Sequence, residues 1–108
     1  MHLKAKMIVD SIRWSLERQG IPVYIEHKGD INAGAIFIAH DKGLGLYDVY
    51  HRVFDYTKGK RIKYLDTFTE EKLKEFFKKQ IDVDADLWFI EIVSKEVDLT
   101  DLFLKQRL

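Results

Sequence analysis

Apolar residues recur along the chain with two different periods, and these periods predict where helices and strands lie. From residue 3 to residue 19 the period is helical, and one face of this helix collects the apolar side chains Ala5, Ile8, Val9, Ile12 and Leu16. Gly20 and Pro22 end the helix. A second apolar stripe lies on its far side: Leu3, Met7 and Trp14. A helix covered on one face does not need this stripe, so either a neighbouring loop or a binding partner covers it.

Alternation with a period of two follows the first helix and predicts a series of strands at residues 21–27, 33–40, 45–54 and 61–65. Pairing residue 25 with 36, and 36 with 49, gathers one apolar face: Val23, Ile25, Ile36, Ile38, Tyr47, Val49 and Val53. The same register places a second apolar set on the opposite face: Tyr24, Phe37, Leu46, Tyr50 and Phe54. We therefore expect that neither face of this sheet is simply exposed to solvent.

A second helix follows, with Thr67 or Thr69 as its N-cap and a buried stripe made by Leu73, Phe76, Phe77 and Ile81. Residues 87–93 form the last and most apolar strand, and the tail packs through Leu99, Leu102 and Phe103. This order predicts one α+β domain over residues 1–108. We expect a mostly antiparallel sheet of about five strands with two helices, in the order α-β-β-β-β-α-β, and with the helices as a single layer on one face.

Three short motifs carry a resemblance to a known family: Lys28-Gly29-Asp30, Ala33-Gly34-Ala35-Ile36-Phe37 and Asp86-Leu87-Trp88-Phe89-Ile90-Glu91. With these motifs and this order of elements, the chain resembles the short alphaproteobacterial proteins grouped as domain-of-unknown-function family 1491. The resemblance covers nearly the whole chain. Ala85 departs from it, because the family often has proline there. The resemblance implies a small bacterial protein of the cytoplasm without an assigned activity, so it supplies no catalytic residues.

Composition and charge exclude several classes of function. The chain has 18 basic and 18 acidic side chains, whereas a general nucleic-acid binder needs a surplus of Lys and Arg. It has no cysteine, which excludes disulfides, thiolate metal sites and a cysteine nucleophile. No run of apolar residues has the length of a signal peptide core or a membrane span. We therefore expect a cytoplasmic protein without a membrane partner.

Histidines offer the main candidate for a metal site. The inferred register places His27 and His51 beside Gly34 on one face, where the absent side chain leaves room for two imidazoles. Zinc requires a further protein ligand, for which Glu91 is a candidate. The simpler interpretation is two partly buried histidines at the rim of the sheet, so we expect no metal and no cofactor. Asp30 and Asn32 are typical of a turn.

A basic patch is the candidate nucleic-acid site. It consists of Lys58, Lys60, Arg61 and Lys63, with Tyr56 and Tyr64 nearby, and aromatic side chains between cations suit single-stranded nucleic acid. Lysines also protect an edge strand from pairing with other chains. The second explanation requires nothing further, so nucleic-acid binding is the alternative.

The order of elements is also similar to the core of the acetyltransferases that use acetyl-coenzyme A. Those enzymes bind pyrophosphate on backbone amides at the start of a helix. At the corresponding turn this chain has no glycine and carries three carboxylates, Asp66, Glu70 and Glu71, which would repel a pyrophosphate. A degenerate acetyltransferase-like enzyme is therefore an alternative that rests on fold-level analogy.

The sequence as a whole favours a non-enzymatic interaction module. Its apolar side chains exceed what one sheet face and one helix layer can bury. We expect it to form a homodimer or to dock a protein partner through a surface that includes Met7, Trp14, Tyr24, Phe37 and Tyr50.

Overall fold

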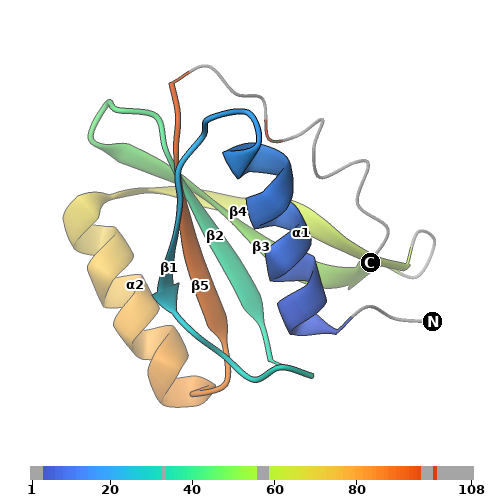
Figure 1. The fold of residues 1–108 in the computed structure, drawn as a ribbon. Helices are drawn as coiled ribbons and strands as arrows, with labels where there is room; N and C mark the ends of the chain where they lie inside the picture. Colours follow the sequence, from blue (N-terminus) through green and yellow to red (C-terminus); the bar gives the residue numbers. More distant parts are fainter. Residues whose placement is uncertain (1–3, 33, 56–58, 96–98, 100–108) are drawn as a thin grey trace.

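The computed structural model describes residues 4–32, 34–55, 59–95 and 99 (Figure 1). These residues form two helices and five strands in the order α-β-β-β-β-α-β, which confirms the predicted α+β class. The elements are α1 (Ala5–Glu17), β1 (Val23–His27), β2 (Ile36–Asp41), β3 (Leu46–Asp55), β4 (Gly59–Thr69), α2 (Glu70–Val83) and β5 (Trp88–Val93).

The five strands form one sheet with the order β1-β5-β2-β3-β4. The last strand therefore lies between the first two, antiparallel to β1 and parallel to β2 (Figure 1). This position overturns the predicted first hairpin, because residues 25 and 36 belong to strands that are not neighbours. The second hairpin forms, but Ala39 pairs with Val49, three residues away from the predicted pairing of 36 with 49. An odd shift reverses the faces, so Val49 lies on the same side as Phe37 and not with Ile36.

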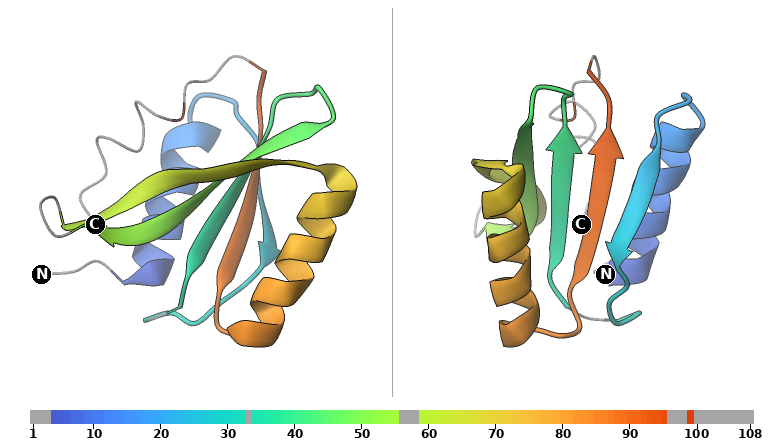
Figure 2. Two further views of the ribbon diagram at one scale, coloured as in Figure 1. Left: turned by 180° about the vertical axis from the view of Figure 1, so that it is seen from behind. Right: turned by 90° about the vertical axis from the view of Figure 1, so that its left-hand side faces the viewer.

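The two helices cover opposite faces of the sheet, as the right-hand view in Figure 2 shows. The side chains beneath α1 include Ile36, Ile38, Trp88, Ile90 and Ile92. Those beneath α2 include Phe37, Ala39, Val49 and Phe89. The expected single layer of helices is therefore wrong, and so is the expected uncovered aromatic face. Each face of the sheet has its own apolar core.

The predicted faces of both helices are confirmed. All five residues of the buried stripe of α1 are at most 1% exposed, and the stripe of α2 packs against the core on its side of the sheet. Thr69 is the N-cap of α2, since its hydroxyl accepts a hydrogen bond from the Lys72 backbone at 3.3 Å. Thr67 instead donates to Asp48. Leu99 is buried against α1, whereas Leu102 and Phe103 lie outside the described residues.

Close contact between two loops positions β5 in the middle of the sheet. Gly29 and Gly34 both pack against the backbone of Asp86, so closely that a Cβ on either glycine would overlap the Asp86 carbonyl oxygen. Gly34 also has a positive φ of 109°, which side-chain-bearing residues rarely adopt. The loop after β1 and the loop before β5 can therefore approach each other only because both positions are glycine.

Hydrogen bonds hold these loops together. The backbone N–H of Asp30 donates to the Asp86 carbonyl at 2.9 Å, and the indole Nε1 of Trp88 donates to the Asp30 carbonyl at 2.7 Å. The N–H of Trp88 donates to the Ala35 carbonyl at 2.7 Å. Asp30 also accepts the N–H of Asn32 at 3.0 Å, which confirms the predicted turn. The three short motifs of the sequence thus meet at one place.

Gly29→Ala tests the importance of this contact. We expect it to lower the free energy of unfolding by about 2–3 kcal/mol, because the new methyl group displaces backbone atoms that belong to the loop before β5. Urea denaturation followed by circular dichroism measures the change.

Gly20→Ala is the matched control. Gly20 has a positive φ of 79°, but no atom lies within 4 Å of the place that an alanine methyl group would take, so we expect a cost of about 1 kcal/mol from backbone strain. Equal costs at the two positions would show that the close approach at Gly29 is not a constraint on the fold.

Candidate functional site

The predicted histidine pair does not form. β1 and β3 are separated by β5 and β2, so His27 and His51 lie about three strand spacings, or about 14 Å, apart across the sheet. Nδ1 of His27 donates to the Leu87 carbonyl at 2.8 Å, and the ring of His51 stacks on Phe37 with centroids 6.0 Å apart. Among the described residues, Glu91 included, no group of three or more His, Cys, Asp or Glu side chains could hold a metal ion.

The candidate basic patch lies on β4, which is an edge strand as predicted. Lys63 is exposed and pairs in register with His51, while Lys60 and Arg61 follow Gly59 along the same strand. Lys58 lies outside the described residues. Nucleic-acid binding by this patch stays a prediction.

The start of α2 carries the carboxylates that the acetyltransferase comparison singled out. Glu70 and Glu71 occupy its first turn, directly after the Thr69 cap. Negative side chains there offset the positive end of the helix, which is the feature that would attract an anionic ligand. Weak or absent binding of a pyrophosphate at this position stays a prediction.

Of the candidate partner-binding residues, Met7, Trp14 and Tyr24 are 53%, 63% and 53% exposed. Phe37 is not available to a partner, because it is 7% exposed and lies edge-on beneath Phe76 with ring centroids 5.5 Å apart. Tyr50 is partly buried against the core beneath α1. Phe37 is buried because α2 covers its face of the sheet, whereas the reversed register of β3 turns Tyr50 to the face that α1 covers. The guanidinium of Arg18 lies 4.3 Å from the ring centroid of Trp14, as in a cation–π contact.

A pocket between α2 and the sheet is a concave site that the sequence analysis did not predict. Its volume is about 220 Å³. Four elements supply the lining: Glu26 from β1, Tyr47 from β3, Glu70, Leu73, Lys74 and Phe77 from α2, and Phe89 and Glu91 from β5. The lining combines aromatic rings with carboxyl groups. We call it the α2 pocket.

Local geometry explains why these side chains converge. β1 and β5 lose their regular register between Ile25 and His27, so the consecutive residues Glu26 and His27 both reach the side of the sheet that α2 covers. The His27 ring lies edge-on to Phe77, with centroids 6.0 Å apart. Phe77 in turn contacts Phe89 at 4.3 Å between centroids, which makes the aromatic wall of the α2 pocket.

Glu91 is the carboxyl group of the pocket with a raised pKa. Burial raises the pKa of Glu91 to about 7, and its hydrogen bond with the Glu26 side chain adds to the effect, as do the charges of Asp41 and Glu70. A hydrogen bond between two carboxyl groups requires a proton on one of them. Burial also raises the pKa of Tyr47. At the mouth of the pocket, Lys74 lies 3.7 Å from a Glu70 carboxylate oxygen.

The sequence contains one signal for this site. Residues 88–93, Trp-Phe-Ile-Glu-Ile-Val, place a single carboxylate inside the most apolar strand. Glutamate is almost never buried without a partner, so this position indicates a local role. Its partner Glu26 lies 65 positions earlier, on a strand that the predicted hairpins do not place beside it, and spacing alone cannot assign the pair.

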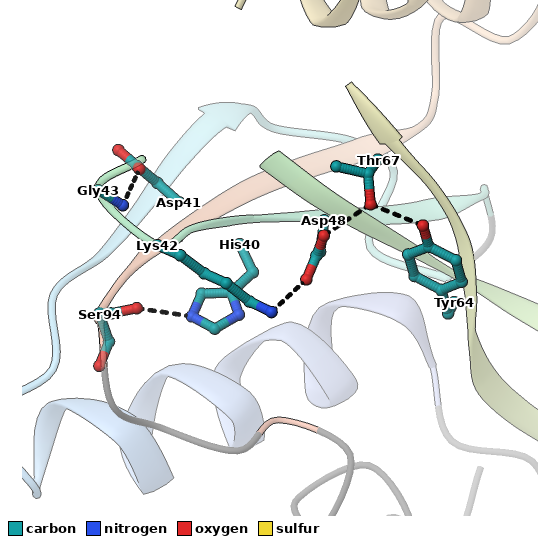
Figure 3. A network of polar contacts seen from close by, with 8 residues as sticks. All are labelled: His40, Asp41, Lys42, Gly43, Asp48, Tyr64, Thr67 and Ser94. Atoms are coloured by element: carbon teal, nitrogen blue, oxygen red, sulfur yellow. Dashed lines mark hydrogen bonds and ion pairs between the residues drawn. The ribbon is translucent and has the colours of Figure 1, made fainter. Parts of the chain in front are cut away.

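A second polar cluster joins the β2–β3 turn to β4 and β5 (Figure 3). His40 is 2% exposed, and its Nε2 donates to the Ser94 carbonyl at 2.9 Å. Burial lowers its pKa, as does the charge of Lys42. Asp48 accepts a hydrogen bond from Lys42 and another from Thr67 at 2.7 Å. These bonds lower the pKa of Asp48 although burial alone would raise it. The cluster connects the ends of four strands, β2, β3, β4 and β5.

Glu91→Gln tests the raised pKa of Glu91. The folded-state pKa of Glu91, about 7, lies above its ordinary value of 4.5, so the stability it contributes is lost as the pH rises through about 7. Glutamine has no proton to lose. We expect the variant to unfold at the same urea concentration as the wild type near pH 4.5. Near pH 8 it should be more stable by on the order of 1 kcal/mol, a value discounted because solvent reaches the carboxyl.

Two features control this comparison. Burial lowers the pKa values of His40 and His51, so their stabilisation is lost as the pH falls below 6.5, but this effect is common to both proteins and cancels in their difference. Glu75→Gln removes an exposed carboxyl of α2 and should give nearly the same difference at both pH values. If the stability difference between Glu91→Gln and the wild type does not grow with pH, the pKa of Glu91 is not raised in the folded protein.

Among the residues that the structure describes, no helix is long and apolar enough to cross a membrane.

Comparisons with known proteins agree with the fold. A solution structure of a protein from A. tumefaciens matches with 24% identity and a TM-score of 0.76 and covers 90% of each chain. A crystal structure of a DUF1491 family protein from Caulobacter crescentus matches with 21% identity and a TM-score of 0.74, over 89% of this chain and 90% of that one. No functionally curated protein matches. Residues 3–100 match the family described as "Protein of unknown function (DUF1491)", and the chain therefore belongs to this family, as its motifs indicated.

Proposed function

We propose that this protein is a non-enzymatic binding module of the cytoplasm and that the α2 pocket is its ligand site. The observation that carries the proposal is the convergence of two hydrogen-bonded carboxyl groups on an aromatic wall within one concavity. A pocket that combines apolar surface, a few convergent polar groups and a strongly shifted pKa is the usual form of a small-ligand site.

The size of the pocket limits the ligand. Its volume of about 220 Å³ is below the roughly 300–1,000 Å³ of pockets that enclose drug-sized molecules. A compact ligand, or one side chain of a larger molecule, matches this volume. A nucleotide-sized cofactor does not.

The carboxyl geometry favours recognition over catalysis. Glycosidases hold their two carboxyl groups at least about 5 Å apart, with the scissile bond between them. Glu26 and Glu91 are instead hydrogen-bonded to each other, which leaves no room for a reacting bond between them. Their polar atoms are available to a ligand that approaches from the pocket.

Closing the mouth of the pocket tests the proposal. Lys74 lines the pocket from the exposed surface of α2, so Lys74→Trp adds bulk there without entering either core. We expect a panel of small neutral, cationic and anionic fragments to shift backbone NMR signals of Tyr47, Leu73 and Phe89 in the wild type. The same fragments should shift those signals much less in Lys74→Trp.

Lys78→Trp is the matched control, because it makes the same change one turn further along the exposed side of the same helix. It should leave fragment binding as in the wild type. If no fragment at millimolar concentration perturbs the pocket residues, or if both variants behave alike, the α2 pocket is not the ligand site.

Self-association through α1 is a second candidate function, favoured by the exposure of Met7 and Trp14 on the side of the helix that faces away from the sheet. The two residues are seven positions apart, so they lie on one stripe of the helix. Two copies of α1 packed antiparallel about a two-fold axis between positions 10 and 11 would bring Met7 of each against Trp14 of the other. The same arrangement would bring exposed Lys4 against Glu17, which is complementary in charge.

Trp14→Glu tests this homodimer. An exposed aromatic side chain at the centre of an interface tends to dominate its energy, so the variant should sediment as a monomer at micromolar concentrations at which the wild type is a dimer. Its circular dichroism should be unchanged, since Trp14 is 63% exposed. Leu44→Glu, in a turn far along the chain and 78% exposed, should remain a dimer. A wild type that is monomeric at these concentrations would rule out self-association.

A further inference from the structure

The α2 pocket carries more negative than positive charge. The ionisable groups that face Glu91 come from every element around it: Glu26 of β1, Asp41 of β2, Tyr47 of β3, and Glu70 and Lys74 of α2. Lys74 is the one cation in this set, and it is already paired with Glu70. An anion in the pocket would meet uncompensated carboxylates, whereas a cation would be attracted by them.

We propose that the α2 pocket binds an alkylammonium group, whose nitrogen contacts the carboxyls of Glu26 and Glu91 and whose alkyl chain packs against Phe77 and Phe89. This inference rests on the proposed binding function and names its class of ligand. An ammonium group has three N–H donors, and the carboxyl groups of Glu26 and Glu91, which both line the pocket, supply the acceptors.

The aromatic wall favours an organic cation over a metal ion. Phe77 and Phe89 lie in edge-to-face contact, and they offer apolar surface to an alkyl chain and a ring face to a cation. A divalent metal needs several oxygen or nitrogen ligands in a closed shell. The described residues hold no cluster of three such ligands, and rings cannot replace them.

A proton and the ammonium group compete for the same place. Burial and the neighbouring Glu26 carboxyl raise the pKa of Glu91 to about 7, so Glu91 holds a proton below that pH in the unliganded protein. A bound ammonium group donates its own hydrogen bonds to the carboxyl oxygens and favours ionised Glu91, so the Glu91 proton leaves to solvent. Because an alkylamine stays protonated up to about pH 10, binding should strengthen as the pH rises from about 6 to about 8.

This chemistry has two natural sources: a free small amine, or a lysine side chain presented by a partner protein. The matched probes are butylammonium, neutral 1-butanol, which has the same alkyl chain, and Nα-acetyl-lysine N-methylamide, which keeps its side-chain ammonium group. Each is titrated into the full chain, and the shifts of the Tyr47, Leu73 and Phe89 backbone NMR signals are followed at about pH 6 and about pH 8.

We expect butylammonium to bind at least about tenfold more tightly than 1-butanol at the higher pH, and more weakly at the lower pH. Glu91→Gln should reduce its affinity about tenfold and remove the pH dependence, while Glu75→Gln should do neither. Binding of the lysine derivative with equal affinity would assign the site to a partner side chain, and its exclusion would assign the site to a free amine. Either result supports the ammonium site.

Two outcomes separate the inference from the function on which it rests. Equal binding of butylammonium and 1-butanol would overturn the ammonium site and leave the α2 pocket as a site for apolar ligands. No perturbation of the pocket signals by either probe or by the fragment panel would overturn both. Ammonium binding that survives Glu91→Gln at both pH values would also overturn the inference, because the cation would then be held elsewhere.

Discussion

The close approach of two glycines to the backbone of Asp86 is the constraint on which the rest of the structure depends. β5 must enter the sheet between β1 and β2, and the loop before it must pass the loop that joins those strands. Gly29 and Gly34 leave room for this passage, because a Cβ on either residue would overlap the carbonyl oxygen of Asp86. That carbonyl instead accepts a hydrogen bond from the Asp30 N–H. The indole of Trp88 then bonds back to Asp30, so the order of strands is fixed at one end of the sheet.

Central placement of β5 determines what its side chains do. A strand with neighbours on both edges and a helix above each face is buried on both sides, which explains the nearly continuous apolar run of residues 87–93. Ile90 and Ile92 fill the core beneath α1, and Phe89 fills the core beneath α2. Glu91 lies on the α2 side with Phe89, where it is partly buried and lines the α2 pocket. The α2 pocket is therefore a consequence of the strand order.

Local patterns predict the elements well and their long-range pairing poorly. The buried stripes of both helices follow from a period of 3.6 residues, and the exposure of Trp14 follows from the same angles. The parallel pairing of β2 with β5 joins residues about 50 positions apart, and no turn between them sets its register. Consecutive strands often pair, which favours a hairpin of residues 25 and 36, and this error propagates to the predicted His27–His51 pair. Gly29 and Gly34 leave room for a close approach, but the sequence does not say which segment approaches.

Glu91 is an ionisable residue in a strand that is otherwise apolar. Its neighbours Ile90 and Ile92 stabilise the sheet through burial, whereas a carboxyl group among them weakens the sheet once it ionises. The hydrogen bond to Glu26 reduces this cost only while Glu91 keeps its proton, which is lost as the pH rises through neutrality. A hydrocarbon side chain at this position would not carry this cost of ionisation. Departures from local consistency of this kind concentrate at functional sites, where a ligand of opposite charge supplies the stabilisation that the unliganded fold lacks.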